Sequence, residues 1–81
     1  MSDADRRQMI ETMVAGLDEK LRANPKDAEG WRRLVRSYMV LGRRDDASDA
    51  LRRGLEALGT GTPEAVALAE ASKALGLGTT E

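Results

Sequence analysis

The side chains of this sequence that are best suited to binding chemistry are arginines. Residues 31–44 contain five arginines and no acidic residue. Arg32 and Arg36 are one helical turn apart and Met39 follows one turn on, so the three would share one face of a helix. A guanidinium binds a carboxylate through two parallel hydrogen bonds, and methionine adapts to varied apolar partners. The pattern predicts a groove for a peptide with acidic residues or a free C-terminus; the alternative is a solvated helix face.

Catalytic and metal-binding chemistry has little support in the sequence. Histidine and cysteine are both absent, which removes the commonest general base and the usual ligands of zinc. The adjacent acidic pairs Asp18-Glu19 and Asp45-Asp46 stand where a helix start or a solvated face would put them. Nothing combines an acid, a base and an orienting group. We therefore expect a protein that is not an enzyme and has no cofactor.

The charge balance argues against nucleic acid as a partner. Thirteen basic and 14 acidic residues give a formal net charge of -1, and no aromatic residue is obviously free to stack on a base. No apolar run approaches the ~20 residues of a transmembrane helix, and the acidic N-terminus lacks the apolar segment of a signal peptide. We expect membrane contact only through parts of a protein that are absent from this chain.

The length of 81 residues predicts a single domain, and the composition predicts an all-α fold. One Trp, one Tyr and no Phe leave a core of Leu, Met, Val and Ala, which suits helices better than sheets. Breaks at Asn24-Pro25, at Gly42 and around Gly59 divide the chain. The expected helices cover about residues 3–23, 28–41, 45–58 and 63–75.

Local signals mark the ends of these predicted helices. Gly42 would end the second helix in a left-handed conformation, and the residues from Gly76 to Glu81 would fray. The expected caps at the four helix starts are Ser2 or Asp3, Asp27, Asp45 or Asp46, and Thr62, which precedes Pro63. Six apolar residues form one stripe along the first helix: Met9, Ile10, Met13, Val14, Leu17 and Leu21.

Two patterns indicate an internal repeat. The first is the order Trp31, Leu34, Tyr38, Ala47 and Leu51 across the second and third helices. The second is a 34-residue shift, which aligns Leu17 with Leu51, Leu21 with Leu55, Leu34 with Leu68, Leu41 with Leu75 and Gly42 with Gly76. Both resemble the tetratricopeptide repeat (TPR) family, whose unit is a helix–turn–helix of 34 residues. The resemblance implies a stack of about four antiparallel helices, and a generic four-helix bundle is the alternative.

The TPR resemblance also implies roles for single residues. Trp31 and Leu34 would pack against the preceding helix, and Ala47 would let two helices approach closely. The clamp that holds two carboxylates in chaperone-binding TPR domains is not reproduced, because Val66 and Glu70 stand where cationic or amide residues would be needed. The concave groove would be lined by Glu29, Arg32, Arg36, Met39 and Val40 of the second helix and by Val66, Glu70 and Lys73 of the fourth.

A narrower resemblance covers about residues 8–55. The residues that carry it are Met9-Ile10, Met13-Val14, Leu17, Leu21, Asn24-Pro25, Asp27, Glu29-Gly30-Trp31, Leu34, Arg36-Ser37-Tyr38, Leu41-Gly42-Arg43 and Ala47. They resemble the TPR segment of the CcmI/CycH family of c-type cytochrome biogenesis proteins. The resemblance implies a periplasmic, chaperone-like adaptor that recognises the C-terminal helix of apocytochrome c, in a longer membrane-anchored protein. Without it, a cytoplasmic location would be expected.

The sequence leaves two functions of different classes open. The first is a protein-binding module for a helical or C-terminal peptide. The second is a structural part, either one slice of a longer TPR solenoid or a homo-oligomerisation unit without a peptide ligand. The two differ at the outer helices, because an internal slice would leave apolar side chains open at each end of the stack.

Overall fold

The computed structural model describes residues 2–77, which form four α-helices and no strand. Each helix begins and ends within one residue of the predicted bounds. The all-α prediction is therefore confirmed. The helices are α1 (Asp3–Ala23), α2 (Ala28–Val40), α3 (Arg44–Leu58) and α4 (Pro63–Ala74). Of the helices in residues 2–77, none is long and apolar enough to span a bilayer.

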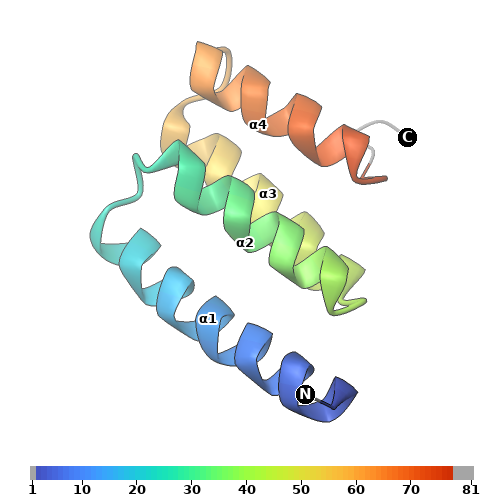
Figure 1. Cartoon of the computed structure of the whole chain (residues 1–81). Coiled ribbons are helices and arrows are strands. Elements are labelled where there is room, and N and C mark those ends of the chain that lie inside the picture. The colour runs from blue at the N-terminus through green and yellow to red at the C-terminus, as the bar shows by residue number, and fades with distance from the viewer. Residues whose placement is uncertain (1, 78–81) are drawn as a thin grey trace.

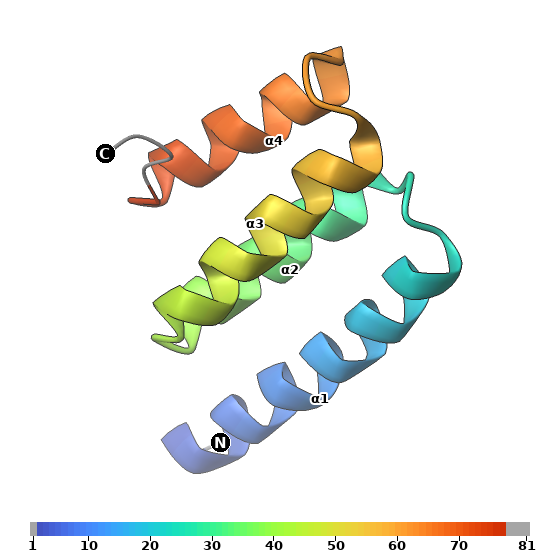
Figure 2. The same cartoon turned by 180° about the vertical axis from the view of Figure 1, so that it is seen from behind.

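The helices form a flat stack with α2 at its centre. The molecule measures 41 by 30 by 16 Å, and α2 contacts each of the other three helices. In Figure 1, α1 and α4 lie on opposite sides of α2, while α3 lies behind it. Figure 2, from the opposite side, places α3 in front of α2. One side of α2 is therefore covered by α3, and the other side is left open between α1 and α4.

Small side chains on α3 allow α2 to approach closely. Ala47, Ala50 and Gly54 follow one another at spacings of three and four, and all three are buried. A methyl group on Gly54 would lie 2.8 Å from Leu68 Cδ2 and 3.0 Å from Trp31 Cγ. Ala47, which was predicted to lie at a close contact between helices, is fully buried.

The environment of Trp31 differs from the prediction, which placed it against the preceding helix. The indole lies over Gly54 of α3, with the Arg53 guanidinium 5.3 Å from the ring centre. Its Nε1 donates a hydrogen bond of 2.8 Å to the Pro25 carbonyl oxygen in the α1–α2 connection. Gly30, one residue earlier, is the position that faces Leu21 of α1. Successive helix positions are about 100° apart, so the two residues face different neighbours.

Arg53 connects three helices through one side chain. It reaches from α3 to Asp18 of α1, with an N–O distance of 2.9 Å, while its plane covers Trp31 of α2. Both members of the ion pair are partly shielded from solvent. A shielded guanidinium–carboxylate pair keeps more of its strength than the exposed pairs along α2 and α3.

Two identical helix endings lie 34 residues apart. Gly42 and Gly76 take φ angles of 76° and 98°, which favour glycine. Each follows the Schellman pattern: the Gly42 and Gly76 amides donate to residues 39 and 73, and the amides of residues 43 and 77 donate to residues 38 and 72. The predicted paired helix ends are thus confirmed.

Leu77 corrects the expectation that the chain frays from Gly76 onward. Its side chain is 3% exposed and joins the hydrophobic core, because the Schellman turn folds it back over α4. The rest of the segment expected to fray, residues 78–81, lies outside the described residues.

Three of the four predicted helix starts are confirmed. The side chains of Ser2, Asp27 and Thr62 accept hydrogen bonds from the backbone amides of the first turns that follow them. The prediction for α3 was wrong: the helix begins at Arg44, and its N-cap residue Arg43 makes no side-chain cap. The glycine turn feeds directly into α3, so Asp45 and Asp46 fall inside the first turn, where their charges suit the helix dipole.

Ser72 should limit the stability of the fold. It is 1% exposed, and its hydroxyl has no hydrogen-bond partner among the described residues. It occupies the α4 position 34 residues after Tyr38. A buried hydroxyl without a partner costs about 1–3 kcal/mol. We expect Ser72→Ala to leave the free energy of unfolding unchanged or raise it by about 1 kcal/mol, as measured by urea denaturation. Exposed Ser48→Ala is the control, and a marked loss of stability in Ser72→Ala would mean that the hydroxyl is satisfied.

Candidate functional site

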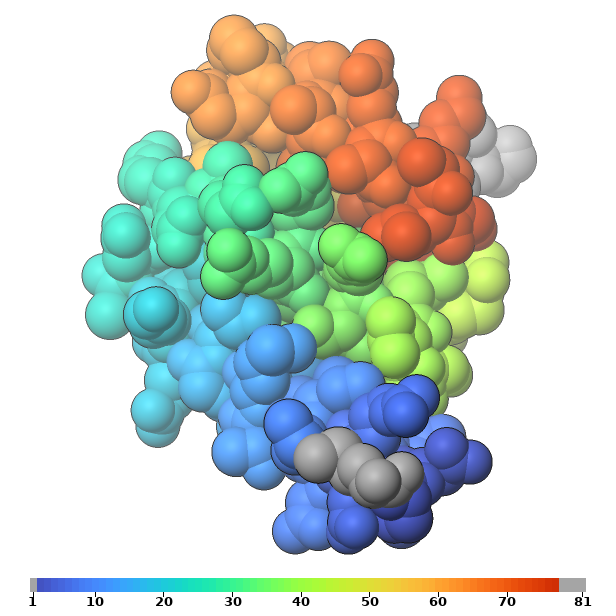
Figure 3. Space-filling view, viewed as in Figure 1, coloured from blue at the N-terminus to red at the C-terminus, as the bar shows by residue number. Residues whose placement is uncertain are grey.

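The open side of α2 carries three exposed arginines, Arg32, Arg33 and Arg36, called here the arginine face. The side of α2 that packs on α3 fixes their orientation, because Trp31, Leu34 and Val35 are buried and the intervening residues must point outward. Figure 3 shows this side of the molecule, with α2 between α1 and α4. The arginine face is bordered by a groove on each side.

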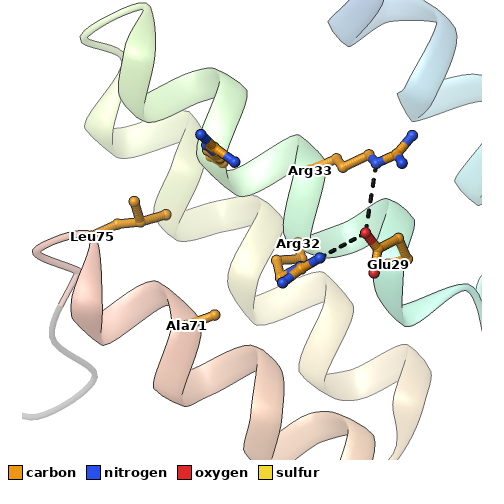
Figure 4. Close-up of a pocket in the computed structure, with 6 residues that line it drawn as sticks. Glu29, Arg32, Arg33, Ala71 and Leu75 are labelled. Carbon is orange, nitrogen blue, oxygen red and sulfur yellow. Dashed lines mark hydrogen bonds and ion pairs between the residues drawn. The ribbon is translucent and has the colours of Figure 1, made fainter.

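The groove between α2 and α4 consists of two adjoining hollows of about 440 and 250 Å³. They share Glu29, Arg32 and Ala71, so they form one continuous depression. The larger hollow is also lined by Arg33, Arg36 and Leu75, and the smaller by Ala28, Glu64, Ala67 and Leu68. In Figure 4, Ala71 and Leu75 point from α4 toward α2. The groove thus combines arginines and carboxylates with a small apolar wall.

The three arginines differ in their partners. Glu29 Oε2 lies 2.6 Å from Arg32 Nη2 and 3.8 Å from Arg33 Nε, as the dashed lines in Figure 4 mark. Among residues 2–77, Arg36 has neither an ion-pair partner nor a side-chain hydrogen bond. Its charge is the one on the arginine face that no nearby carboxylate offsets.

The groove between α1 and α2 is more apolar. A hollow of about 340 Å³ is lined by Ile10, Met13, Val40 and Ser37, with Arg33 and Arg36 at its edge. A second hollow of about 240 Å³ continues it through Ile10 and Val40. Its other lining residues are Asp3, Arg6, Arg7 and Leu41. Arg33 and Arg36 line hollows on both sides of α2, so either groove brings a ligand to them.

The predicted site residues are distributed unevenly over these grooves. Glu29, Arg32 and Arg36 line the α2–α4 groove, whereas Val40 lines the α1–α2 groove. Met39 is half-buried and packs against the core. The residues of α4 that line the grooves described above are Glu64, Ala67, Leu68, Ala71 and Leu75 rather than Val66, Glu70 and Lys73. Val66 is exposed outside both grooves, so the peptide-binding role assigned to these three residues stays a prediction.

Several groove residues were missed at the level of sequence. Ile10 and Met13 had been placed in the core stripe of the first helix, but only Val14 and Leu21 of α1 are fully buried. The width of that stripe indicated that part of it would stay exposed, because six apolar residues are more than one neighbouring helix can cover. Arg33 and Ala71 had no distinguishing spacing of their own, and the 34-residue spacing of Leu75 from Leu41 marked a helix end rather than a groove.

The described residues offer binding rather than acid–base chemistry. No group of three His, Cys, Asp or Glu side chains within residues 2–77 is placed to hold a metal ion. Burial, together with the charge of Asp18, raises the pKa of the Tyr38 phenol, so Tyr38 stays neutral beneath the Arg43 guanidinium, 5.0 Å from its ring. This pair lies where α2 ends and α3 begins, apart from both grooves.

Curated proteins provide two related sequences. The chain is 53% identical over 57 residues to the cytochrome c-type biogenesis protein CycH of Rhizobium meliloti, a match covering 70% of this chain and 15% of the relative. It is 43% identical over 77 residues to CycH of Bradyrhizobium diazoefficiens, covering 95% of this chain and 21% of the relative. No family model matches the chain, and no solved structure gives a significant match. The chain is therefore related to one segment, between a seventh and about a fifth of the length, of the CycH proteins.

Proposed function

We propose that this chain is a non-enzymatic peptide-binding module that acts in the maturation of c-type cytochromes. Its ligand would be a helical segment of an apocytochrome c, and its binding surface the arginine face with the bordering grooves. The observation that carries the proposal is Arg36, an exposed cation without an ion-pair partner in residues 2–77, which lies between hollows whose walls are partly apolar. Guanidinium groups beside apolar walls suit an amphipathic helix that carries carboxylates.

The likeness to CycH supports the choice of ligand. CycH proteins are named for cytochrome c biogenesis, and the matched segment includes the arginine face in the longer of the two alignments, which covers 95% of this chain. The proposal extends to the architecture: α1 to α4 would be half a TPR unit, one whole unit and half a unit. The 34-residue spacing of the two Schellman turns supports this reading. A periplasmic location would accompany the proposed role.

A structural role is the second candidate, and one observation favours it. Met9 on α1 and Val66 on α4 are 59% and 48% exposed, so each outer helix presents an apolar side chain to solvent. In a solenoid such residues pack on the next repeat. A slice of a longer stack would need no peptide ligand of its own.

Peptide titration tests the proposed function. Labelled C-terminal helices of c-type apocytochromes should bind the wild-type chain, measured by fluorescence anisotropy, and scrambled sequences should bind at least tenfold more weakly. Arg32→Glu with Arg36→Glu should weaken binding by about a hundredfold or more, since charge-assisted hydrogen bonds contribute about 1.5–3 kcal/mol each and 1.4 kcal/mol is tenfold. Circular dichroism should remain unchanged, because both side chains are exposed.

A matched control separates the loss of the two arginines from the change in net charge. Lys20→Glu with Lys26→Glu changes the net charge by the same amount on exposed residues outside the groove linings described above. This variant should bind like the wild type. Absence of binding by the wild type to every helix would reject the proposal and favour the structural role, while equal binding of scrambled and native helices would reject the cytochrome ligand.

A further inference from the structure

We infer that the ligand places its apolar ridge in the groove between α1 and α2 and a carboxylate on Arg36. The α2–α4 groove, where the sequence predicted the ligand, would be secondary. This inference rests on the proposed function and specifies the ligand's chemistry: an amphipathic helix with an acidic side chain directly beside its apolar ridge.

The walls of the α1–α2 groove carry the first part of the argument. Met13 of α1 is 49% exposed and Val40 of α2 is 64% exposed, and with Ile10 they line one hollow. Two helices therefore contribute apolar side chains to a shared depression that no described residue fills. An apolar ridge laid into this depression would bury apolar surface on both helices, which favours binding.

The charges around the two grooves carry the second part. The α1–α2 groove is bordered by four arginines and one acidic residue: Arg6, Arg7, Arg33, Arg36 and Asp3. The α2–α4 groove contains the carboxylates of Glu29 and Glu64, and Glu29 already occupies Arg32. An acidic ligand is repelled by those carboxylates and attracted to the other groove.

Arg36 is the residue that holds the ligand's carboxylate. Arg7 donates to the Leu41 carbonyl oxygen at 3.1 Å and Arg33 lies 3.8 Å from Glu29, so both are partly engaged. Arg6 and Arg36 have no such partner among residues 2–77, and of these two only Arg36 lines the hollow that contains Met13 and Val40. A ligand that binds Arg36 breaks no existing ion pair, whereas one that binds Arg32 must displace Glu29.

The first test compares two exposed apolar residues. Met13→Glu and Val66→Glu introduce the same charge at helix positions of equal exposure, 49% and 48%, but only Met13 lines the inferred groove. The probe is an 18-residue amphipathic helix with a leucine ridge flanked by glutamates. Met13→Glu should weaken its binding on the order of tenfold or more, and Val66→Glu less than threefold. The opposite order would overturn the inference and return the site to the α4 residues predicted from sequence.

The second test compares variants of Arg36 and Arg32 in their binding to a charged and an uncharged probe. Arg36→Gln should weaken binding of the glutamate probe by roughly tenfold to a hundredfold, and this loss should disappear with a probe whose flanking glutamates are glutamines. Arg32→Gln should weaken binding of the glutamate probe less than Arg36→Gln does, because Glu29 already occupies Arg32. An equal loss for the two variants, or a loss at Arg36 that persists with the glutamine probe, would overturn the role of Arg36.

The outcomes separate the inference from the proposed function. If the wild type binds apocytochrome helices but Met13→Glu and Arg36→Gln bind equally well, the proposed function stands and the inferred groove is wrong. If the wild type binds no helix, the proposed function itself fails. Unchanged circular dichroism in all four variants is required, and it is expected because the four side chains are exposed.

Discussion

Trp31→Ala is expected to remove a large share of the free energy of unfolding. The indole is 3% exposed, fills the space over Gly54 and anchors the α1–α2 connection through Pro25. Removing a buried aromatic side chain costs about 3–5 kcal/mol. At about 0.05–0.15 kcal/mol per residue, the whole fold holds only about 4–12 kcal/mol. A thermal melt followed by circular dichroism should show a lower midpoint.

Trp31→Phe separates the two contributions of the indole. Phenylalanine keeps most of the aromatic surface but cannot donate the hydrogen bond to the Pro25 carbonyl oxygen. The loss should be about 0.5–1.5 kcal/mol for the hydrogen bond, which is only partly buried, together with a small loss of packing. A near-wild-type midpoint for Trp31→Ala would show that the indole does not hold α2 and α3 together.

Gly54→Ala is expected to destabilise the fold although alanine is the better helix former. An added methyl would lie 2.8 Å from Leu68 Cδ2 and 3.0 Å from Trp31 Cγ, inside a buried contact of α2, α3 and α4. Overpacking of this kind costs about 1–3 kcal/mol and outweighs the gain in helix propensity of about 1 kcal/mol. Urea denaturation should show the loss as a lower midpoint.

Gly16→Ala supplies the matched control for this prediction. Gly16 lies inside α1, and apart from its chain neighbours and the nearby backbone of that helix, a methyl group there would meet no atom of residues 2–77 within 4 Å. The same substitution should therefore stabilise the protein by about 0.5–1 kcal/mol. If Gly54→Ala also gained stability, the contact of α3 with Trp31 and Leu68 would be less tight than these distances indicate.

Much of the proposed binding surface could be placed from the sequence, but the ion pairs within it could not. Arg32 and Arg36 could be placed on one exposed face of α2 because Trp31, Leu34 and Tyr38 occupy the other. Glu29 pairs with Arg32, whereas Arg36 has no ion-pair partner in the described part of the chain, and this depends on which side chains meet at the surface. The position of Val66 also depends on packing. Val66 is apolar like Val40, but it lies outside the grooves, whereas Val40 lines one of them.

The sequence by itself determined the four helices and where they end, because those signals act within a few residues. Caps at Ser2, Asp27 and Thr62 and the left-handed Gly42 and Gly76 need only their nearest neighbours along the chain. Packing decided what each helix face meets. Leu77 became a core residue only because the turn after α4 folds it back, and Trp31 faces α3 because the rotation of α2 puts Gly30 toward α1. Met13 stayed open because α2 covers only part of the stripe on α1. A helical period tells which residues share a face, whereas burial depends on how much of that face a neighbour reaches.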